Sequence, residues 1–207
     1  MDVDLVVPMK HPRDGKSRLR GAVAPDRHPA LVLALAADTL AAVTSTARVR
    51  RVLLVAADPV AVAELAELGV EIVAEPEEKT LNAAFRHGAT LLRQDDPGAV
   101  VGALQADLPA LRAIDLTDAI AEAGAERAFV ADRQGTGTTL LLSAPGAPLD
   151  PHFGPGSARL HEASGAIPLR RKLPSLRSDV DTPEDLAHVQ SLGVGKHTAA
   201  KIGELFT

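Results

Sequence analysis

The chain has 207 residues, of which 46% are hydrophobic and 24% charged, and its formal net charge is −5. This composition is typical of a folded globular protein, and the length is enough for one large domain with its own core. The acidic balance disfavours a broad nucleic-acid footprint, and four Phe with no Trp or Tyr leave few aromatic faces for stacking bases. The absence of cysteine excludes disulfides, thiolate metal sites and a cysteine nucleophile.

No segment approaches the roughly 20 apolar residues that a membrane-spanning helix needs. The first residues, MDVDLVVPMK, carry acids before and within a short apolar run, which is unlike a secretory signal peptide. We therefore expect a cytoplasmic protein with neither a membrane nor a nucleic acid as its partner.

Short apolar runs and helical patterns alternate along the first part of the chain. Strands are predicted at residues 3–7, 51–58, 70–75 and 99–107, and helices at residues 29–43, 59–69, 81–94 and 114–124. This alternation is typical of an α/β fold with a mostly parallel central sheet and helices on both faces. Further on, apolar runs at residues 127–132 and 137–144 flank a turn and predict a hairpin. No linker divides the chain, so we expect one domain over residues 1–207, with residues 191–207 as a helical tail.

In such sheets, ligands bind beyond the carboxyl ends of the strands. The connection after the first strand, KHPRDGKSRLR, carries five cationic side chains: Lys10, Arg13, Lys16, Arg18 and Arg20. A cationic loop in that place suits a polyphosphate, although the P-loop pattern G-x-x-x-x-G-K-[ST] is absent. A solvated basic loop without a ligand is the alternative.

Three carboxylates follow predicted strands or extended segments. Asp107 ends the strand that reaches ALQAD, and Asp179 and Asp181 alternate in an extended segment, which puts both side chains on one face. Carboxylates grouped in this way suit a hard cation such as Mg²⁺. Thr182 and Pro183 have the pattern of a helix start. The alternative interpretation is that Asp181 belongs to this helix start and not to a metal site.

Two glycine-rich segments lie in the last third of the chain. In FGPGSARLH, Gly154 and Gly156 permit close backbone approach, and Ser157 starts a predicted helix whose amides could face an anion. GTGTTLLL begins a predicted strand with hydroxyls, Thr139 among them. Either segment alone could be an ordinary turn, but together with the carboxylates and the cationic loop they favour an anion site.

The tail sequence LGVGKHTAAKIG resembles one helix-hairpin-helix, a module that binds the DNA backbone through glycine amides. A C-terminal helix that packs on the domain is the alternative interpretation. A nucleotide- or DNA-backbone-binding module is therefore a second candidate function.

Six segments, taken in order, resemble the CofC family of guanylyltransferases, which act in the biosynthesis of the deazaflavin coenzyme F-420: VPMKHPRDGKSRL, EKTLNAAFRHG, ADLPAL, GTGTTLLL, FGPGSARLH and DVDTPEDL. The resemblance spans Val3 to about Gly195. It implies a nucleotidyltransferase fold of the GT-A type. It also implies transfer of GMP from GTP to the phosphate of a three-carbon acid, phosphoenolpyruvate or 2-phospho-L-lactate, with release of pyrophosphate. The Ala- and Arg-rich composition suggests a high-GC genome. Because actinobacterial members of the family are described as using phosphoenolpyruvate, this composition favours phosphoenolpyruvate as the acceptor.

The resemblance also implies roles for residues that match the family motifs. Acceptor binding falls to Thr139, Gly154 and Ser157; Mg²⁺ binding and catalysis to Asp107, Asp179 and Asp181, with Lys16; and nucleotide binding to Lys10, Lys16, Arg18, Glu78 and Asn82. The implied partners are GTP, the acceptor acid and a downstream transferase that passes the product to a deazaflavin. A different acceptor, such as a sugar phosphate or molybdopterin, is the nearest rival.

Overall fold

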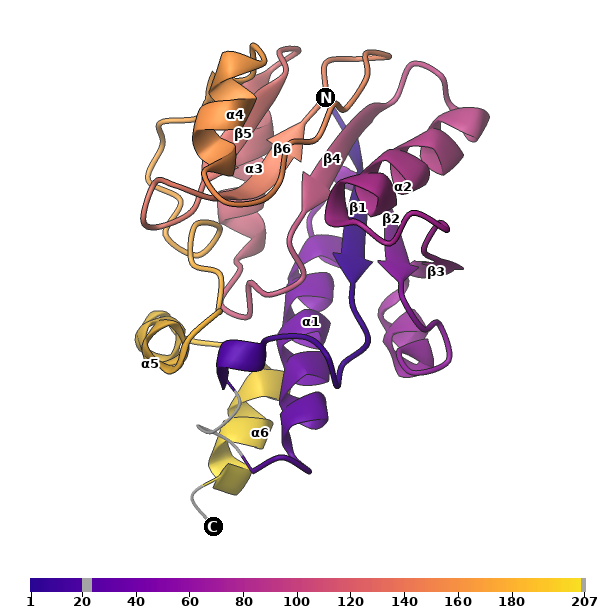
Figure 1. Cartoon of the computed structure of the whole chain (residues 1–207). Helices are drawn as coiled ribbons and strands as arrows, with labels where there is room; N and C mark the ends of the chain where they lie inside the picture. Colours follow the sequence, from indigo (N-terminus) through magenta and orange to yellow (C-terminus); the bar gives the residue numbers. More distant parts are fainter. Residues whose placement is uncertain (20–23, 206–207) are drawn as a thin grey trace.

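The computed structural model describes residues 1–19 and 24–205, and its centre is a seven-stranded sheet of order β3-β2-β1-β4-β6-β5-β7 (Figure 1). The strands are β1 (Val3–Met9), β2 (Val49–Ala56), β3 (Glu71–Ala74), β4 (Val100–Leu104), β5 (Ala128–Ala131), β6 (Thr138–Leu142) and β7 (Ile167–Pro168). The α-helices are α1 (His28–Thr44), α2 (Leu81–Asp95), α3 (Ala113–Ala123), α4 (Ser157–Ala163), α5 (Pro183–Leu192) and α6 (Lys196–Leu205). This architecture confirms the predicted α/β class.

The first four strands in chain order run parallel to one another. β1 pairs with β2 and with β4, and β2 pairs with β3, all in parallel register. β6 is antiparallel to both β4 and β5, whereas β7 is parallel to β5. Both the mostly parallel sheet and the hairpin of β5 and β6 are therefore confirmed.

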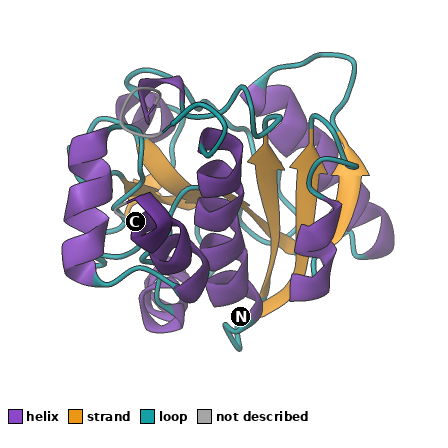
Figure 2. Ribbon diagram, turned by 90° about the horizontal axis from the view of Figure 1, so that it is seen from below, coloured by secondary structure: helices purple, strands orange, loops and turns teal. Residues whose placement is uncertain are grey.

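Helices cover both faces of the sheet (Figure 2). Successive residues of β1 point to opposite faces, so Leu5 belongs to the core under α1 and α3, and Val6 to the core under α2 and α4. Phe85 of α2 lies in the second core and is fully buried. Strands covered on both sides explain the continuous apolar runs in the sequence.

Two elements differ from their predicted form. β1 continues through Pro8 to Met9, because β4 pairs with β1 only as far as Val6 and a strand without a neighbour on one side tolerates proline. The predicted helix at residues 59–69 is a short 3₁₀ helix, Ala63–Leu68, that ends at Gly69. Asp58 accepts hydrogen bonds from the amides of Val60 and Ala61, so the chain turns before a helix can start.

The last two helices lie past the end of the sheet at which β1 and β2 finish, and α6 lies along α1 (Figure 1). Thr182 caps α5 in a capping box, as the sequence predicts. The buried carboxylate of Asp38 on α1 accepts the amides of His197 and Thr198 at 3.0 and 2.7 Å, so it caps α6. Within the described ranges, no helix has the length and apolar character needed to cross a membrane.

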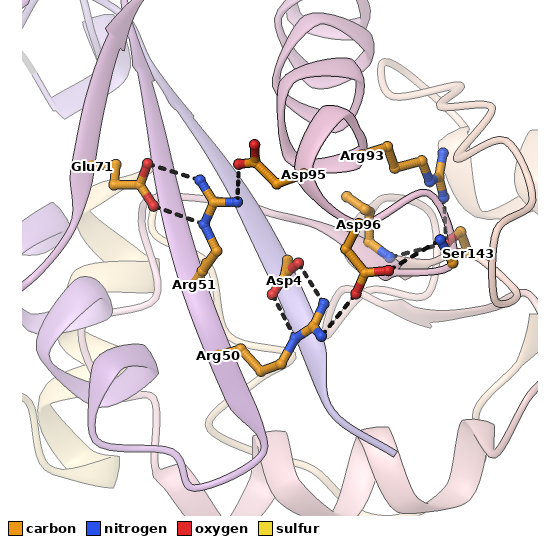
Figure 3. Close-up of polar contacts among 10 residues, drawn as sticks. Asp4, Arg50, Arg51, Glu71, Arg93, Asp95, Asp96 and Ser143 are labelled. Atoms are coloured by element: carbon orange, nitrogen blue, oxygen red, sulfur yellow. Dashed lines mark hydrogen bonds and ion pairs between the residues drawn. The ribbon is translucent and has the colours of Figure 1, made fainter.

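At the end where the parallel strands begin, arginines and carboxylates form two compact clusters (Figure 3). Arg50 donates to both oxygens of Asp4 at 3.0 and 2.8 Å and to Asp96 at 2.9 Å. Arg51 donates to Glu71 and to Asp95 in the same way. These clusters tie β1, β2, β3 and the end of α2 together.

Candidate active site

A cavity of about 450 Å³ opens at the opposite end of the sheet, beyond the carboxyl ends of β1, β2 and β4. Its apolar wall comes from Val32 and Leu35 of α1, Val55 of β2 and Leu81 of α2. Its polar wall comes from the loop 14–18 and from residues 105–107 after β4. This is the position in which open parallel sheets bind ligands.

Three of the five predicted cationic side chains, Lys10, Lys16 and Arg18, line this cavity. Arg13 is not among the lining residues, and Arg20 lies outside the described residues. Lys79, which precedes α2, also lines the cavity and was missed at the sequence level. The only signal for Lys79 was its place in the EKT segment, two residues from a helix start.

Lys16 projects from a tightly folded loop. Its backbone has a φ of 52°, which is uncommon outside glycine, and its carbonyl accepts the amide of Leu19 at 2.9 Å. The carbonyl of the preceding Gly15 accepts a hydrogen bond of 2.8 Å from Nε2 of His28, a residue buried at the start of α1. The loop is therefore anchored on both sides of Lys16.

The Lys16 ammonium lies between two of the predicted carboxylates. It contacts Asp107 Oδ2 and lies 2.6 Å from Asp181 Oδ1. Burial alone would lower the pKa of Lys16, but the two carboxylates outweigh burial and raise that pKa above its usual value. Lys16 is therefore a fixed positive charge at the edge of the cavity.

Asp179 completes a cluster of three carboxylates. Val180 is fully buried and its amide donates to the carbonyl of Asp107 at 3.1 Å, which holds the segment 179–181 against the end of β4. Burial and the charges of Asp107 and Asp181 raise the pKa of Asp179 from 3.8 to about 7. One ammonium therefore faces three carboxyl groups.

The chemistry of this cluster suits a hard cation, since all its donors are carboxylate oxygens. Asp107 Oδ1 is buried and, within the described residues, has no hydrogen-bond partner. Over those same ranges, no three Asp, Glu, His or Cys side chains stand in an arrangement that could hold a metal ion. The Lys16 ammonium occupies the space between Asp107 and Asp181, so a cation bound to both would require Lys16 to move.

The two glycine-rich segments meet at α4. Ala158 donates its amide to the carbonyl of Thr136 at 3.1 Å, and the Ser157 hydroxyl donates to Thr138 Oγ1 at 3.2 Å. Gly154 and Gly156 have φ values of 141° and 72°, and only open space surrounds the place where a side chain would start. Both positions therefore need glycine for their conformation.

A neutral histidine lies behind this loop. His161 accepts the amide of His152 at Nε2, so its Nδ1 carries the proton and donates to Thr138 Oγ1 at 2.9 Å. Burial, with Arg127 and His152 nearby, lowers the pKa of His161 to about 4. Thr138, Ser157 and His161 therefore form one buried network.

Thr139 is not part of that network. It is fully buried, and its hydroxyl donates to the carbonyl of Val130 at 3.5 Å. Thr138 bonds His161 and Ser157 of α4, whereas Thr139 lies where the register between β5 and β6 shifts, so alternation along β6 does not hold at this point. Glu78 and Asn82 lie near the start of α2, but neither lines the cavity. Glu78 bonds Thr80 and Arg86, and Asn82 bonds the backbone of Phe153.

Comparison with solved structures identifies the fold. A protein from Desulfovibrio desulfuricans G20, described as a nucleotide-diphospho-sugar transferase, superposes with a TM-score of 0.73 at 16% identity, over 99% of this chain and 95% of that one. A 4-diphosphocytidyl-2C-methyl-D-erythritol synthase superposes with a TM-score of 0.59 at 14% identity, over 93% and 99%. Both likenesses confirm a nucleotidyltransferase-type fold.

Comparison of sequences identifies the family. The chain is 50% identical to a phosphoenolpyruvate guanylyltransferase of Thermomonospora curvata, over 95% of this chain and 86% of the relative. It is 48% identical to a protein of the same name from Streptomyces scabiei, over 99% and 98%. The family model for CofC-like guanylyl transferases matches residues 3–205. The chain therefore belongs to the family of CofC-like guanylyl transferases.

Proposed function

We propose that this protein transfers GMP from GTP to phosphoenolpyruvate and releases pyrophosphate, in the biosynthesis of coenzyme F-420. The observation that carries the proposal is the 450 Å³ cavity lined by Lys10, Lys16 and Arg18, with Asp107 and Asp181 at its edge. Relatives that match nearly the whole chain at 48–50% identity bear the name of this activity. A cytoplasmic location is part of the proposal.

The reaction needs positioning and charge neutralisation more than a strong base. An oxygen of the acceptor phosphate, already ionised near neutral pH, attacks the α-phosphorus of GTP, and the bond from that phosphorus to the β-phosphate oxygen breaks. The cationic loop holds the triphosphate, and Lys16, fixed in its charged form, neutralises charge that develops near the α-phosphate. No cysteine, serine or histidine nucleophile is required.

Mg²⁺ is part of the proposal, with Asp107, Asp179 and Asp181 as its ligands. When bound, it would supply positive charge to the phosphates of both substrates. The buried Oδ1 of Asp107 and the surplus of carboxylates over Lys16 support this assignment. A cation held by both Asp107 and Asp181 would require the Lys16 ammonium to leave its place between these two carboxylates.

The loop 153–157 is the proposed acceptor site, with Gly154 and Ser157 as contacts. The hydroxyl of Thr139 is buried, so its proposed part in the acceptor site is through its backbone. Its carbonyl accepts the amide of Gln105 at 3.0 Å. This pairing connects the acceptor side to the segment that leads to Asp107. A transferase that consumes the diphosphate product with a deazaflavin is the proposed downstream partner.

The proposal is tested by measuring pyrophosphate release from GTP and Mg²⁺ with phosphoenolpyruvate or 2-phospho-L-lactate, in the presence of the downstream transferase and its deazaflavin. We expect release with phosphoenolpyruvate. Release with 2-phospho-L-lactate alone would replace the acceptor and keep the reaction. Silence with both acids, in a folded protein that binds GTP, would refute the proposed reaction.

The tail gives little support to the alternative of DNA-backbone binding. The amides at the start of α6, which such a module would direct at phosphate, are bonded to the carboxylate of Asp38. A side chain at Gly195 would collide with that carboxylate, so the glycine serves the packing of α6 on α1.

A further inference from the structure

The side chain of Asn82 joins the first turn of α2, which also lines the nucleotide cavity through Leu81 and Ala84, to the proposed acceptor loop. Its Nδ2 donates to the carbonyl of Phe153 at 3.0 Å, and its Oδ1 accepts the amide of Phe153 at 2.8 Å. The amide group thus pairs with both backbone groups of one residue, as a neighbouring β-strand would. This residue directly precedes Gly154.

Helical geometry separates two faces at the start of α2. Leu81 and Ala84, three residues apart, line the cavity. Asn82 and Phe85, also three residues apart, hold Phe153: Asn82 bonds its backbone, and Phe85 packs on its ring with a centroid distance of 4.4 Å.

Phe153 transmits this anchoring to the loop. Phe153 is 7% exposed, and its ring packs against the ring of His161 at a centroid distance of 5.0 Å and an interplanar angle of 72°. His161 in turn bonds Thr138, which accepts from Ser157. The backbone of Phe153 and the hydroxyl of Ser157 are therefore fixed at opposite ends of the sequence Gly154-Pro155-Gly156.

We propose that Asn82 is a positioning residue that holds the loop 153–157 in its acceptor-binding conformation against the wall of the nucleotide cavity. The proposal rests on the proposed function, because that function assigns the acceptor to this loop. It predicts that loss of the Asn82 pairing weakens binding of the acceptor acid and leaves binding of GTP nearly unchanged.

The test compares Asn82→Asp with Gln94→Glu, since both replace a side-chain amide by a carboxylate on the same helix and Gln94 is exposed and distant from the loop. An aspartate accepts from the Phe153 amide but cannot donate to its carbonyl. We expect the KM for phosphoenolpyruvate to rise at least about tenfold in Asn82→Asp, with the KM for GTP within about twofold of wild type. Gln94→Glu leaves both unchanged.

A rise in the KM for GTP with an unchanged acceptor KM would overturn the proposal and make Asn82 a nucleotide contact. Unchanged values for both substrates would show that the pairing is dispensable. Asn82→Ala, which removes both hydrogen bonds without adding charge, must give the same pattern as Asn82→Asp.

Hydrogen exchange of the amides in residues 153–158 keeps this test separate from the proposed reaction. Without any substrate, we expect faster exchange in Asn82→Asp than in Gln94→Glu. Equal exchange would refute the anchoring itself, whatever the enzyme proves to transfer. Faster exchange in a protein that transfers GMP to none of the acids would sustain the anchoring and refute only the reaction.

Discussion

Both ends of the parallel strands carry cationic side chains and carboxylates. These groups are fully paired at the amino end and incompletely paired at the carboxyl end. At the amino end, Arg50 and Arg51 each bond two carboxylates, and even Asp4, which is 1% exposed, has both oxygens paired (Figure 3). At the carboxyl end, Lys16 faces three carboxyl groups, and Asp107 keeps a buried oxygen without a partner among the described residues. The satisfied end stabilises the sheet, whereas the unsatisfied end has binding capacity left for a ligand.

The largest effect is expected from Asp107→Asn. The variant keeps the shape of the side chain and loses its charge, so we expect GMP transfer to fall at least about 100-fold while the protein stays folded. Pyrophosphate release measures this loss. Asp95→Asn at the opposite end, where Asp95 is 69% exposed, should retain wild-type activity. Near-normal activity in Asp107→Asn would refute the assigned role of this carboxylate.

Asp179→Asn should stabilise the metal-free protein at high pH. The pKa of Asp179 is about 7 in the folded state against 3.8 for the model carboxyl, so between those values the folded state binds more protons than the unfolded state. Its contribution to stability is therefore present below about pH 4 and is lost as the pH rises through 7. Above pH 7 the ionised carboxylate destabilises the fold, because burial and the charges of Asp107 and Asp181 oppose its ionisation.

Urea unfolding at pH 8 and at pH 4 measures this difference. We expect Asp179→Asn to exceed wild type at pH 8 and to match it at pH 4, although the same variant loses activity. If the variant and the wild type were equally stable at both pH 8 and pH 4, the three carboxylates would not repel one another. The contrast between the two ends of the strands would then be lost.

Arg50→Met removes the guanidinium that pairs with Asp4 at the amino end of the strands. The Asp4 carboxylate then stays buried without that partner. We expect the free energy of unfolding to fall by about 2–3 kcal/mol, with the KM for GTP unchanged, because the cavity is at the other end of the strands. Arg48→Met is the matched control: the Arg48 and Asp2 side chains are 46% and 53% exposed, so their ion pair should contribute less than about 1 kcal/mol. Losses of equal size in the two variants would contradict the difference in burial.

Some features of the active site were readable in the sequence because they are local. Alternation along the extended segment placed Asp179 and Asp181 on one face, with the buried Val180 between them in the sequence. The position of the loop after the first strand placed Lys10, Lys16 and Arg18 at a ligand cavity. Thr139 shows the limit of such reasoning. The register of β5 and β6 shifts between Val130 and Ala131, and only the paired strands reveal that Thr138 faces α4.

The sequence by itself determined the order of the elements, the parallel character of the sheet and the helix ends at Gly69, Gly124 and Thr182. These features depend on periodicity and on hydrogen bonds between residues close in the chain. The tertiary structure decided which motifs meet. Lys16 contacts carboxylates 91 and 165 residues away, and Asn82 pairs with a backbone 71 residues away. Such contacts depend on strand order and loop packing, which no short stretch of sequence encodes.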